Sequence, residues 1–151
     1  MTRPIALATV LALLVGCSER RVVIHYVIPN GYRGPLKIVG DGDDSNGYAF
    51  EAGQHVYRFP QSAVLHVKTT WPFENWHSLT AEYANGTTIY SLWHSAPNSD
   101  AIRVEGLGFS TGHTGPGAFW DVVGNEREVR RSQKAWDENG SDTLEGRLGK
   151  N

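Results

Sequence analysis

The chain has 151 residues with 14 basic and 16 acidic side chains, so its formal net charge at pH 7 is −2. This balance provides no electrostatic surface for nucleic acid, and the length suits one domain with a single core. The single cysteine cannot form a disulfide within the chain, so packing and hydrogen bonds must stabilise the fold.

The N-terminal segment has the organisation of an export signal. A cationic start precedes an apolar run from Ile5 to Val15 that is too short to span a membrane. The segment Leu14-Val15-Gly16-Cys17 resembles the lipobox of bacterial lipoproteins. That resemblance implies removal of residues 1–16 as a signal peptide, acylation of Cys17 and a membrane anchor, and Ser18 favours the outer membrane in a cell that has one. The alternative is an ordinary signal peptide that ends before a cysteine.

Residues 22–124 have the pattern of short apolar runs and turn residues that is typical of an all-β domain. Short runs of β-branched and aromatic residues alternate with glycine, proline and asparagine, which predicts a single antiparallel β-sandwich, transthyretin-like or immunoglobulin-like. Residues 17–21 leave only a short tether to the lipid, which would hold the domain close to the membrane. Strands are expected near residues 22–28, 35–39, 48–51, 55–59, 63–68, 78–84, 87–93, 101–105 and 118–123.

The dipeptide Asn85-Gly86 predicts a hairpin with a two-residue type I′ turn, because both positions tolerate positive φ. In that register Ala81 pairs with Tyr90 and Tyr83 pairs with Thr88. The pairing collects apolar side chains on one face, and a slip of one residue would exchange the two faces.

A short helix is expected over residues 125–136, after the last strand. Asn125 and Glu128 have the spacing of a capping box, and Trp136 supplies one of the few apolar contacts. We therefore expect this helix to dock weakly on the sandwich and residues 137–151 to be disordered. In the alternative, the basic side chains of the helix contact the membrane surface: Arg127, Arg130, Arg131 and Lys134.

The run from Ile28 to Gly34 reads Ile-Pro-Asn-Gly-Tyr-Arg-Gly. It resembles the Ile-Pro-x-Gly-Tyr-x-Gly motif of an uncharacterised family of small β-domain lipoproteins, and the segment from Phe119 to Asn125 is similar to a second segment of that family. The resemblance implies a lipid-anchored β domain and no particular activity. Because Pro29 and Gly31 form a bend and Tyr32 can fold its ring onto the core, we interpret the motif as architectural.

Two further motifs lack the context that their chemistry requires. The segment from Gly108 to Gly112 matches the Gly-x-Ser-x-Gly pattern of serine hydrolases, but no helix can follow it and no downstream histidine completes the Ser, Asp, His order. The loop over residues 40–47 lacks the glycine and the final glutamate of an EF-hand. We interpret both as connecting segments and expect no enzyme activity, with non-standard calcium binding by the loop as an alternative.

Two histidines form a candidate metal site. If the hairpin register continues outward, His77 lies opposite His94, with Cβ atoms about 4.5–5.5 Å apart. Two imidazoles at this separation could chelate zinc or copper, provided that the fold adds a third ligand such as His66 or His113. The alternative is that the two histidines cap the end of the core face beside tryptophans.

An aromatic cluster near one end of the predicted sandwich contains Trp71, Trp76 and Trp93. Indoles that face solvent on an exported domain could stack on sugars or hold a partner protein. The alternative is that these side chains cover the sheet and serve only the structure.

These observations favour a membrane-anchored lipoprotein whose mature part is a non-catalytic binding or structural module of the cell envelope. Its partners would be the membrane, through Cys17, and an envelope protein or polysaccharide at the tryptophan cluster. No cofactor is expected. The competing hypothesis is a metal-binding envelope domain that uses His77 and His94 with a third ligand.

Overall fold

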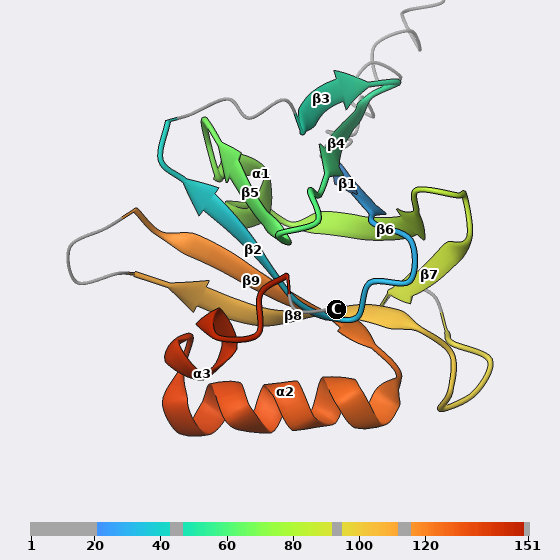
Figure 1. The fold of residues 1–151 in the computed structure, drawn as a ribbon. Helices are drawn as coiled ribbons and strands as arrows, with labels where there is room; N and C mark the ends of the chain where they lie inside the picture. The colour runs from blue at the N-terminus through green and yellow to red at the C-terminus, as the bar shows by residue number, and fades with distance from the viewer. Residues whose placement is uncertain (1–20, 43–46, 92–94, 112–115, 150–151) are drawn as a thin grey trace, which may run out of the picture.

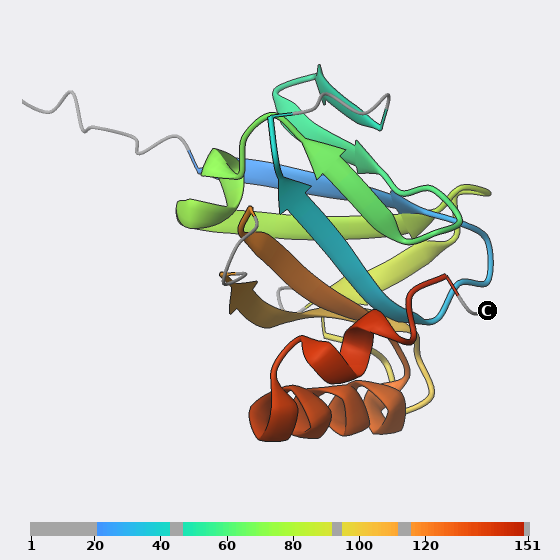
Figure 2. The same ribbon diagram turned by 60° about the vertical axis from the view of Figure 1, so that its left-hand side comes forward.

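The computed structural model describes residues 21–42, 47–91, 95–111 and 116–149. Within these ranges, nine strands form one sheet that curls into a nearly closed barrel, and two helices lie against its outer face (Figure 1, Figure 2). The predicted lipidation site Cys17 lies outside the described residues.

The strands are β1 (Val22–Ile28), β2 (Gly34–Gly40), β3 (Tyr48–Glu51), β4 (Gln54–Arg58), β5 (Val64–Val67), β6 (His77–Tyr83), β7 (Thr88–Ser91), β8 (Arg103–Ser110) and β9 (Ala118–Gly124). The helices are α1 (Trp71–Glu74), α2 (Glu126–Asn139) and α3 (Asp142–Glu145). The strand order in the sheet is β3-β4-β1-β6-β7-β8-β9-β2-β5. No helix in this part of the chain is long and apolar enough to cross a bilayer.

The predicted strands are present, and their ends agree with the structure to within two residues except at the end of β8. That strand continues to Ser110, whereas the prediction ended it at residue 105. The chain is therefore mostly β with a helix at its C-terminal side, as the sequence pattern indicates.

The predicted antiparallel sandwich is wrong in its strand pairing. β1 pairs in parallel with both β4 and β6, β2 pairs in parallel with β5, and β7 pairs in parallel with β8. Parallel neighbours need crossover connections, and β2 and β3 supply the chain that connects β1 to β4. The physical reason for the error is that turn signals report only neighbours joined by short loops.

The barrel interior holds most of the core. Alternate residues of β1, including Ile24, Tyr26 and Ile28, are buried there. Tyr26 packs edge-to-face against Phe59, with ring centroids 5.1 Å apart. A second apolar cluster lies on the outer face of β9, where α2 and α3 cover Trp120.

The hairpin between β6 and β7 is shifted by one residue from its predicted register. Ala81 lies opposite Ile89, whereas the prediction paired Ala81 with Tyr90. The connecting loop holds three residues, 84–86, and Gly86 at a φ of 83° supplies the left-handed residue that such loops need. The shift places Ile89 against the core in place of Tyr90.

The Ile28–Gly34 motif forms the turn between β1 and β2. Gly31 takes a positive φ of 73°. Tyr32 is buried, and its hydroxyl donates a hydrogen bond to the carbonyl of Pro35. The Tyr83 hydroxyl donates a hydrogen bond to the Tyr32 carbonyl at 3.0 Å. These contacts fix the bend between the two strands, in agreement with the architectural interpretation.

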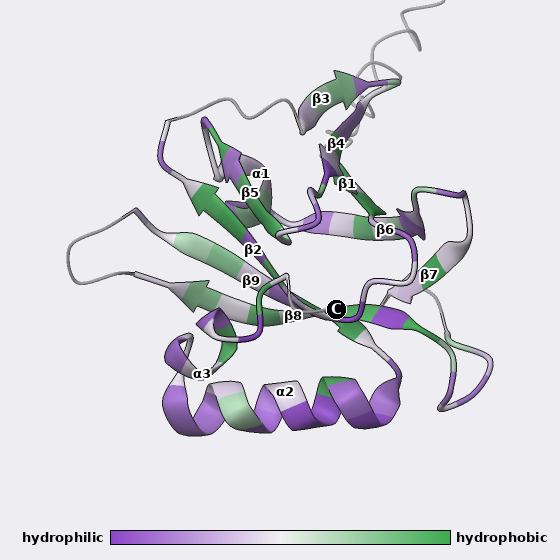
Figure 3. Ribbon diagram, in the orientation of Figure 1, coloured by the Kyte–Doolittle hydropathy of each residue, from purple (hydrophilic) through white to green (hydrophobic). Residues whose placement is uncertain are grey.

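The predicted capping box begins α2. The Asn125 side chain accepts a hydrogen bond from the Glu128 N–H at 3.0 Å, and the Glu128 carboxylate accepts one from the Asn125 N–H at 2.8 Å. The helix runs to Asn139, beyond its predicted end. It docks through Trp136, whose ring centroid lies 6.2 Å from that of Trp120, while mostly hydrophilic residues occupy its length (Figure 3).

The prediction of a disordered tail over residues 137–151 is wrong for the part that the structure describes, up to residue 149. The end of α2 and the short α3 occupy this segment. Leu144 is 0% exposed, and Leu148 packs against both apolar clusters. Two leucines are enough to hold this segment against the sheet, because the outer face of β2 and β9 supplies the rest of the apolar surface.

Candidate functional site

Exposed aromatic side chains gather at the end of the barrel where β1 begins. The strand register places them together: Val22 lies opposite His77, and the ring of His55 at the start of β4 lies near two of them. We call this surface the aromatic end, and its exposed members are Phe50, Trp71, Trp76 and Phe109.

The structure places two of the three predicted tryptophans at this surface. Trp71 is 52% exposed and Trp76 is 72% exposed. Trp71 belongs to α1, and Trp76 precedes β6 directly, so one short connection presents both indoles. Trp93 lies outside the described residues.

A cleft separates the first half of β6 from the second half of β8. β7, which stands between these strands in the sheet, covers four of the described residues, and residues 92–94 after it lie outside the described ranges. The cleft comprises two adjoining cavities of about 240 and 300 Å³ that share the side chains of His77, Leu79 and Asp121. Trp76 lines the first cavity and Phe109 lines the second. We call this feature the β6–β8 cleft.

Asp121 lines both cavities of the cleft and is 8% exposed. The Tyr26 hydroxyl donates a hydrogen bond to the Asp121 carboxylate at 2.8 Å. Burial raises the pKa of Asp121 to about 6, and the hydrogen bond from Tyr26 opposes part of that rise. Burial and the nearby carboxylate both raise the pKa of Tyr26, so the tyrosine stays protonated as a donor. The cleft therefore contains a carboxyl group that titrates near pH 6.

Sequence reasoning missed Asp121. The available signal was one acidic residue inside the otherwise apolar strand from Ala118 to Val123. Its alternation with Phe119 and Val123 places it on the face that lines the barrel interior. That direction becomes visible only when the pairing of β9 is known.

His77 lies at the edge of the cleft in a fixed orientation. Its Nδ1 is 2.7 Å from the carbonyl oxygen of Asn75. Because a carbonyl can only accept, Nδ1 carries the proton, and Nε2 of the neutral ring is a hydrogen-bond acceptor. The imidazole can thus accept a hydrogen bond from a hydroxyl group in the cleft.

The predicted metal site is not assembled by the residues that the structure describes. His94 and the candidate third ligand His113 lie outside these residues, and the hairpin register that paired His77 with His94 is shifted by one position. His66 belongs to β5, which is the last strand in the sheet order and is not a neighbour of β6. Its ring is hydrogen-bonded to Asp41. Within the described ranges, no group of three histidine, cysteine or acidic side chains could hold a metal ion. The loop over residues 40–47 is described only in part.

The comparisons with known proteins define no family for this chain. No protein family model matches it, and no curated protein matches it. Among solved structures, it is similar to a crystal structure of a Bacillus anthracis protein described as a candidate lipoprotein, with 15% identity, coverage of 78% of this chain and 77% of that chain, and a TM-score of 0.39. A likeness this loose decides neither the fold family nor the function.

Proposed function

We propose that the protein is a membrane-anchored lipoprotein of the cell envelope, and that its β domain is a non-catalytic module that binds a saccharide chain. The lipobox resemblance around Cys17 supports the anchor. The observation that carries the binding proposal is the exposed Trp76 at the mouth of a cleft that contains a buried carboxyl group.

The chemistry of the cleft suits a sugar ring. An exposed indole offers a flat apolar surface on which the apolar face of a pyranose can stack. Asp121 and the Nε2 atom of His77 can accept hydrogen bonds from sugar hydroxyls in the same cavity. Apolar walls with a few convergent polar groups are typical of small-molecule binding sites.

The same geometry supports binding without hydrolysis. Glycoside hydrolases commonly use two carboxyl groups on opposite sides of the scissile bond. Asp121 is the one acidic side chain among the described residues that line the cleft. Ser110, the serine of the Gly-x-Ser-x-Gly segment, belongs to β8, and its hydroxyl accepts a hydrogen bond from the Trp120 indole at 2.9 Å. This serine does not stand on the strand-to-helix turn of a nucleophile elbow.

Binding to purified envelope glycans, with the detergent-extracted protein, tests the proposal. We expect the Trp76→Ala variant to bind at least about tenfold more weakly, because the stacking surface is removed. Phe50→Ala is the matched control, since Phe50 is exposed at the same end but does not line the cleft. Glycan binding that is unaffected by Trp76→Ala, or release of shortened glycans, would contradict the proposed function.

A further inference from the structure

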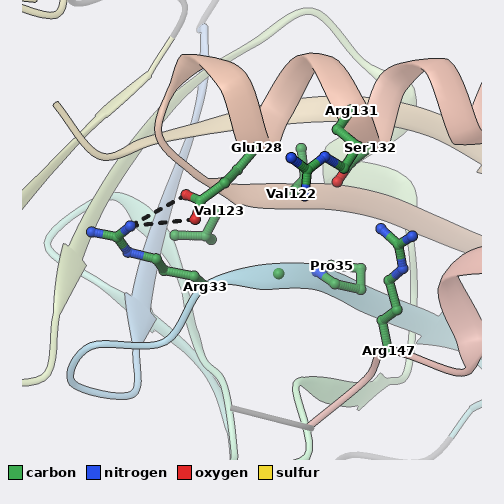
Figure 4. Close-up of a pocket in the computed structure, with 9 residues that line it drawn as sticks. Arg33, Pro35, Val122, Val123, Glu128, Arg131, Ser132 and Arg147 are labelled. Atoms are coloured by element: carbon green, nitrogen blue, oxygen red, sulfur yellow. Dashed lines mark hydrogen bonds and ion pairs between the residues drawn. The ribbon is translucent and has the colours of Figure 1, made fainter. Parts of the chain in front are cut away.

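A second pocket, of about 310 Å³, lies where β2 begins (Figure 4). Three arginines line it: Arg33 precedes β2, Arg131 belongs to α2, and Arg147 follows α3. Because they come from three separate segments, only the folded chain brings them together. Pro35 and Val122 form apolar parts of the wall.

The positive charge of this pocket is only partly balanced. Glu128 is the one acidic residue among the described lining residues, and its carboxylate accepts hydrogen bonds from Arg33 Nη1 at 3.3 and 3.4 Å. Glu128 also caps the start of α2. The guanidinium groups of Arg131 and Arg147 form no ion pair or hydrogen bond with the described part of the chain. Two cationic groups thus share one pocket without a partner.

Two other cations on α2 are paired, and Arg127, which forms no ion pair with the described residues, lies outside the pocket. Arg130 donates a hydrogen bond to Glu126 at 3.0 Å, and Lys134 lies 3.8 Å from Glu138. The basic helix of the sequence is therefore not a uniform cationic face. Its unpaired Arg131 points toward the pocket that Arg147 also lines (Figure 4).

A serine hydroxyl group lies in the same pocket. Ser132 is 6% exposed, and its hydroxyl forms no hydrogen bond with the described residues. Figure 4 draws this oxygen between the guanidinium groups of Arg131 and Arg147. The Ser132 oxygen is not one of the buried polar atoms that lack a partner, so it is open to the pocket and can donate a hydrogen bond to a bound oxyanion.

We propose that this pocket binds a phosphate group. The planar guanidinium groups of Arg131 and Arg147 donate paired hydrogen bonds to phosphate oxygens, and the Ser132 hydroxyl donates another. Two free guanidinium groups match the charge and the several oxygens of a phosphate, whereas one arginine already satisfies the two oxygens of a carboxylate. The phosphate is either free in solution or carried by a larger envelope molecule such as a phosphorylated polymer. This inference does not depend on the saccharide proposal, because the two sites share no lining residue.

The position of Arg147 gives binding a measurable effect on stability. Arg147 lies on the C-terminal segment, and the other residues that line the pocket lie on α2, on β9 and at the start of β2. A ligand that contacts all of them holds this segment against the sheet and stabilises the folded chain in proportion to the logarithm of its concentration.

Thermal unfolding of the detergent-extracted protein in inorganic phosphate, at constant ionic strength, tests the proposal. We expect a saturable rise of Tm in phosphate and no rise in acetate at the same concentrations. Arg131→Gln and Arg147→Gln should each weaken phosphate binding at least tenfold, and Ser132→Ala should weaken it several-fold. Arg130→Gln is the matched control, because Arg130 is paired with Glu126 and lies outside the pocket. Line broadening of the phosphate ³¹P resonance gives a second readout in any variant of reduced stability.

Glycerol phosphate distinguishes the two sources of the ligand. Binding at least tenfold tighter than that of inorganic phosphate indicates a phosphate carried by a polymer, and equal binding indicates the free ion. Either result supports the site, provided that Arg131→Gln weakens the binding of the probe at least tenfold. The proposal is overturned if neither probe binds, if acetate gives an equal rise of Tm, or if the Arg131 and Arg147 variants bind like the wild type.

Discussion

The buried carboxyl group of Asp121 lowers the stability of the fold when it is charged. Its carboxyl group has an ordinary pKa of 3.8, and burial raises that pKa to about 6 in the folded chain. Between these two pKa values, Asp121 is largely protonated in the folded state and largely ionised in the unfolded state. The contribution of Asp121 to stability is therefore largest below the unfolded pKa and is lost as pH rises through the folded pKa.

Replacing this carboxyl group should stabilise the protein at neutral pH. Asp121→Asn keeps the shape of the side chain and an acceptor for the Tyr26 hydroxyl, and it removes the buried charge. A rise in pKa of this size corresponds to roughly 3 kcal/mol, which is the upper limit of the gain in unfolding free energy expected at pH 7. Urea unfolding at pH 7 and pH 4 measures it, and the gain should disappear at pH 4.

Asp137→Asn controls for the general loss of a negative charge, because Asp137 is an exposed acid of α2 outside the cleft and forms no ion pair with the described residues. The explanation fails if Asp121→Asn lowers stability equally at both pH values, since that result would indicate a lost contact and not a lost charge.

Residue types alone identified part of the candidate site. Trp71, Trp76 and His77 stood out because indole and imidazole groups are rare and chemically informative. Asp121 did not, since the inward direction of an acid in a strand depends on pairing that is distant in sequence. Arg147 belongs to a segment for which the sequence predicts disorder. The sequence therefore does not indicate that Arg147 and Arg131 line the same pocket.

At the scale of elements, the strands were predictable because each alternating run ends at glycine, proline or asparagine. The register of the β6–β7 hairpin was not. The dipeptide Asn85-Gly86 fits both a two-residue loop and a three-residue loop that ends in a left-handed glycine, and the structure has the second. The two loops differ by one residue, which is sufficient to exchange the faces of β7.

The short helix α3 should contribute measurably to stability, although few apolar residues hold it. Leu144→Ala removes a fully buried side chain between α3 and the outer face of the sheet, and we expect a loss of about 2–4 kcal/mol in the free energy of unfolding. Chemical denaturation measures the loss. Asp137→Ala, at an exposed position of α2, should change stability by less than about 0.5 kcal/mol. Equal stability of the Leu144→Ala protein and the wild type would show that α3 does not dock in solution.

At the scale of the whole molecule, the topology could not be predicted from local patterns. β1 is the first strand of the chain and lies inside the sheet, hydrogen-bonded on one side to β4 and on the other to β6. These parallel neighbours lie across long connections, where turn residues give no information. The consequence is functional, since parallel packing brings the starts of β1, β4 and β6 to the same end of the barrel.

That arrangement makes a prediction about orientation in an acylated protein. Cys17 is separated from the start of β1 at Val22 by residues 18–21, and a fully extended chain of this length reaches only about 17 Å. The aromatic end lies at the same end of the barrel as Val22, because Val22 pairs with His77 beside Trp76. A lipid on Cys17 would therefore hold the aromatic end near the bilayer, where tryptophan side chains are favoured at the interface.

Acrylamide quenching of tryptophan fluorescence tests this orientation. In vesicles, the acylated protein should be quenched less than the Cys17→Ser protein in solution, because Trp71 and Trp76 are shielded by the bilayer while Trp120 is buried in both states. A flexible glycine and serine linker of about twenty residues, inserted after Ser18, should restore quenching without releasing the protein from the vesicles. If the short tether and the long tether give equal quenching, the bilayer does not cover the aromatic end. The saccharide proposal adds a constraint, since a glycan that reaches Trp76 must then enter from the side of the β6–β8 cleft, parallel to the membrane surface.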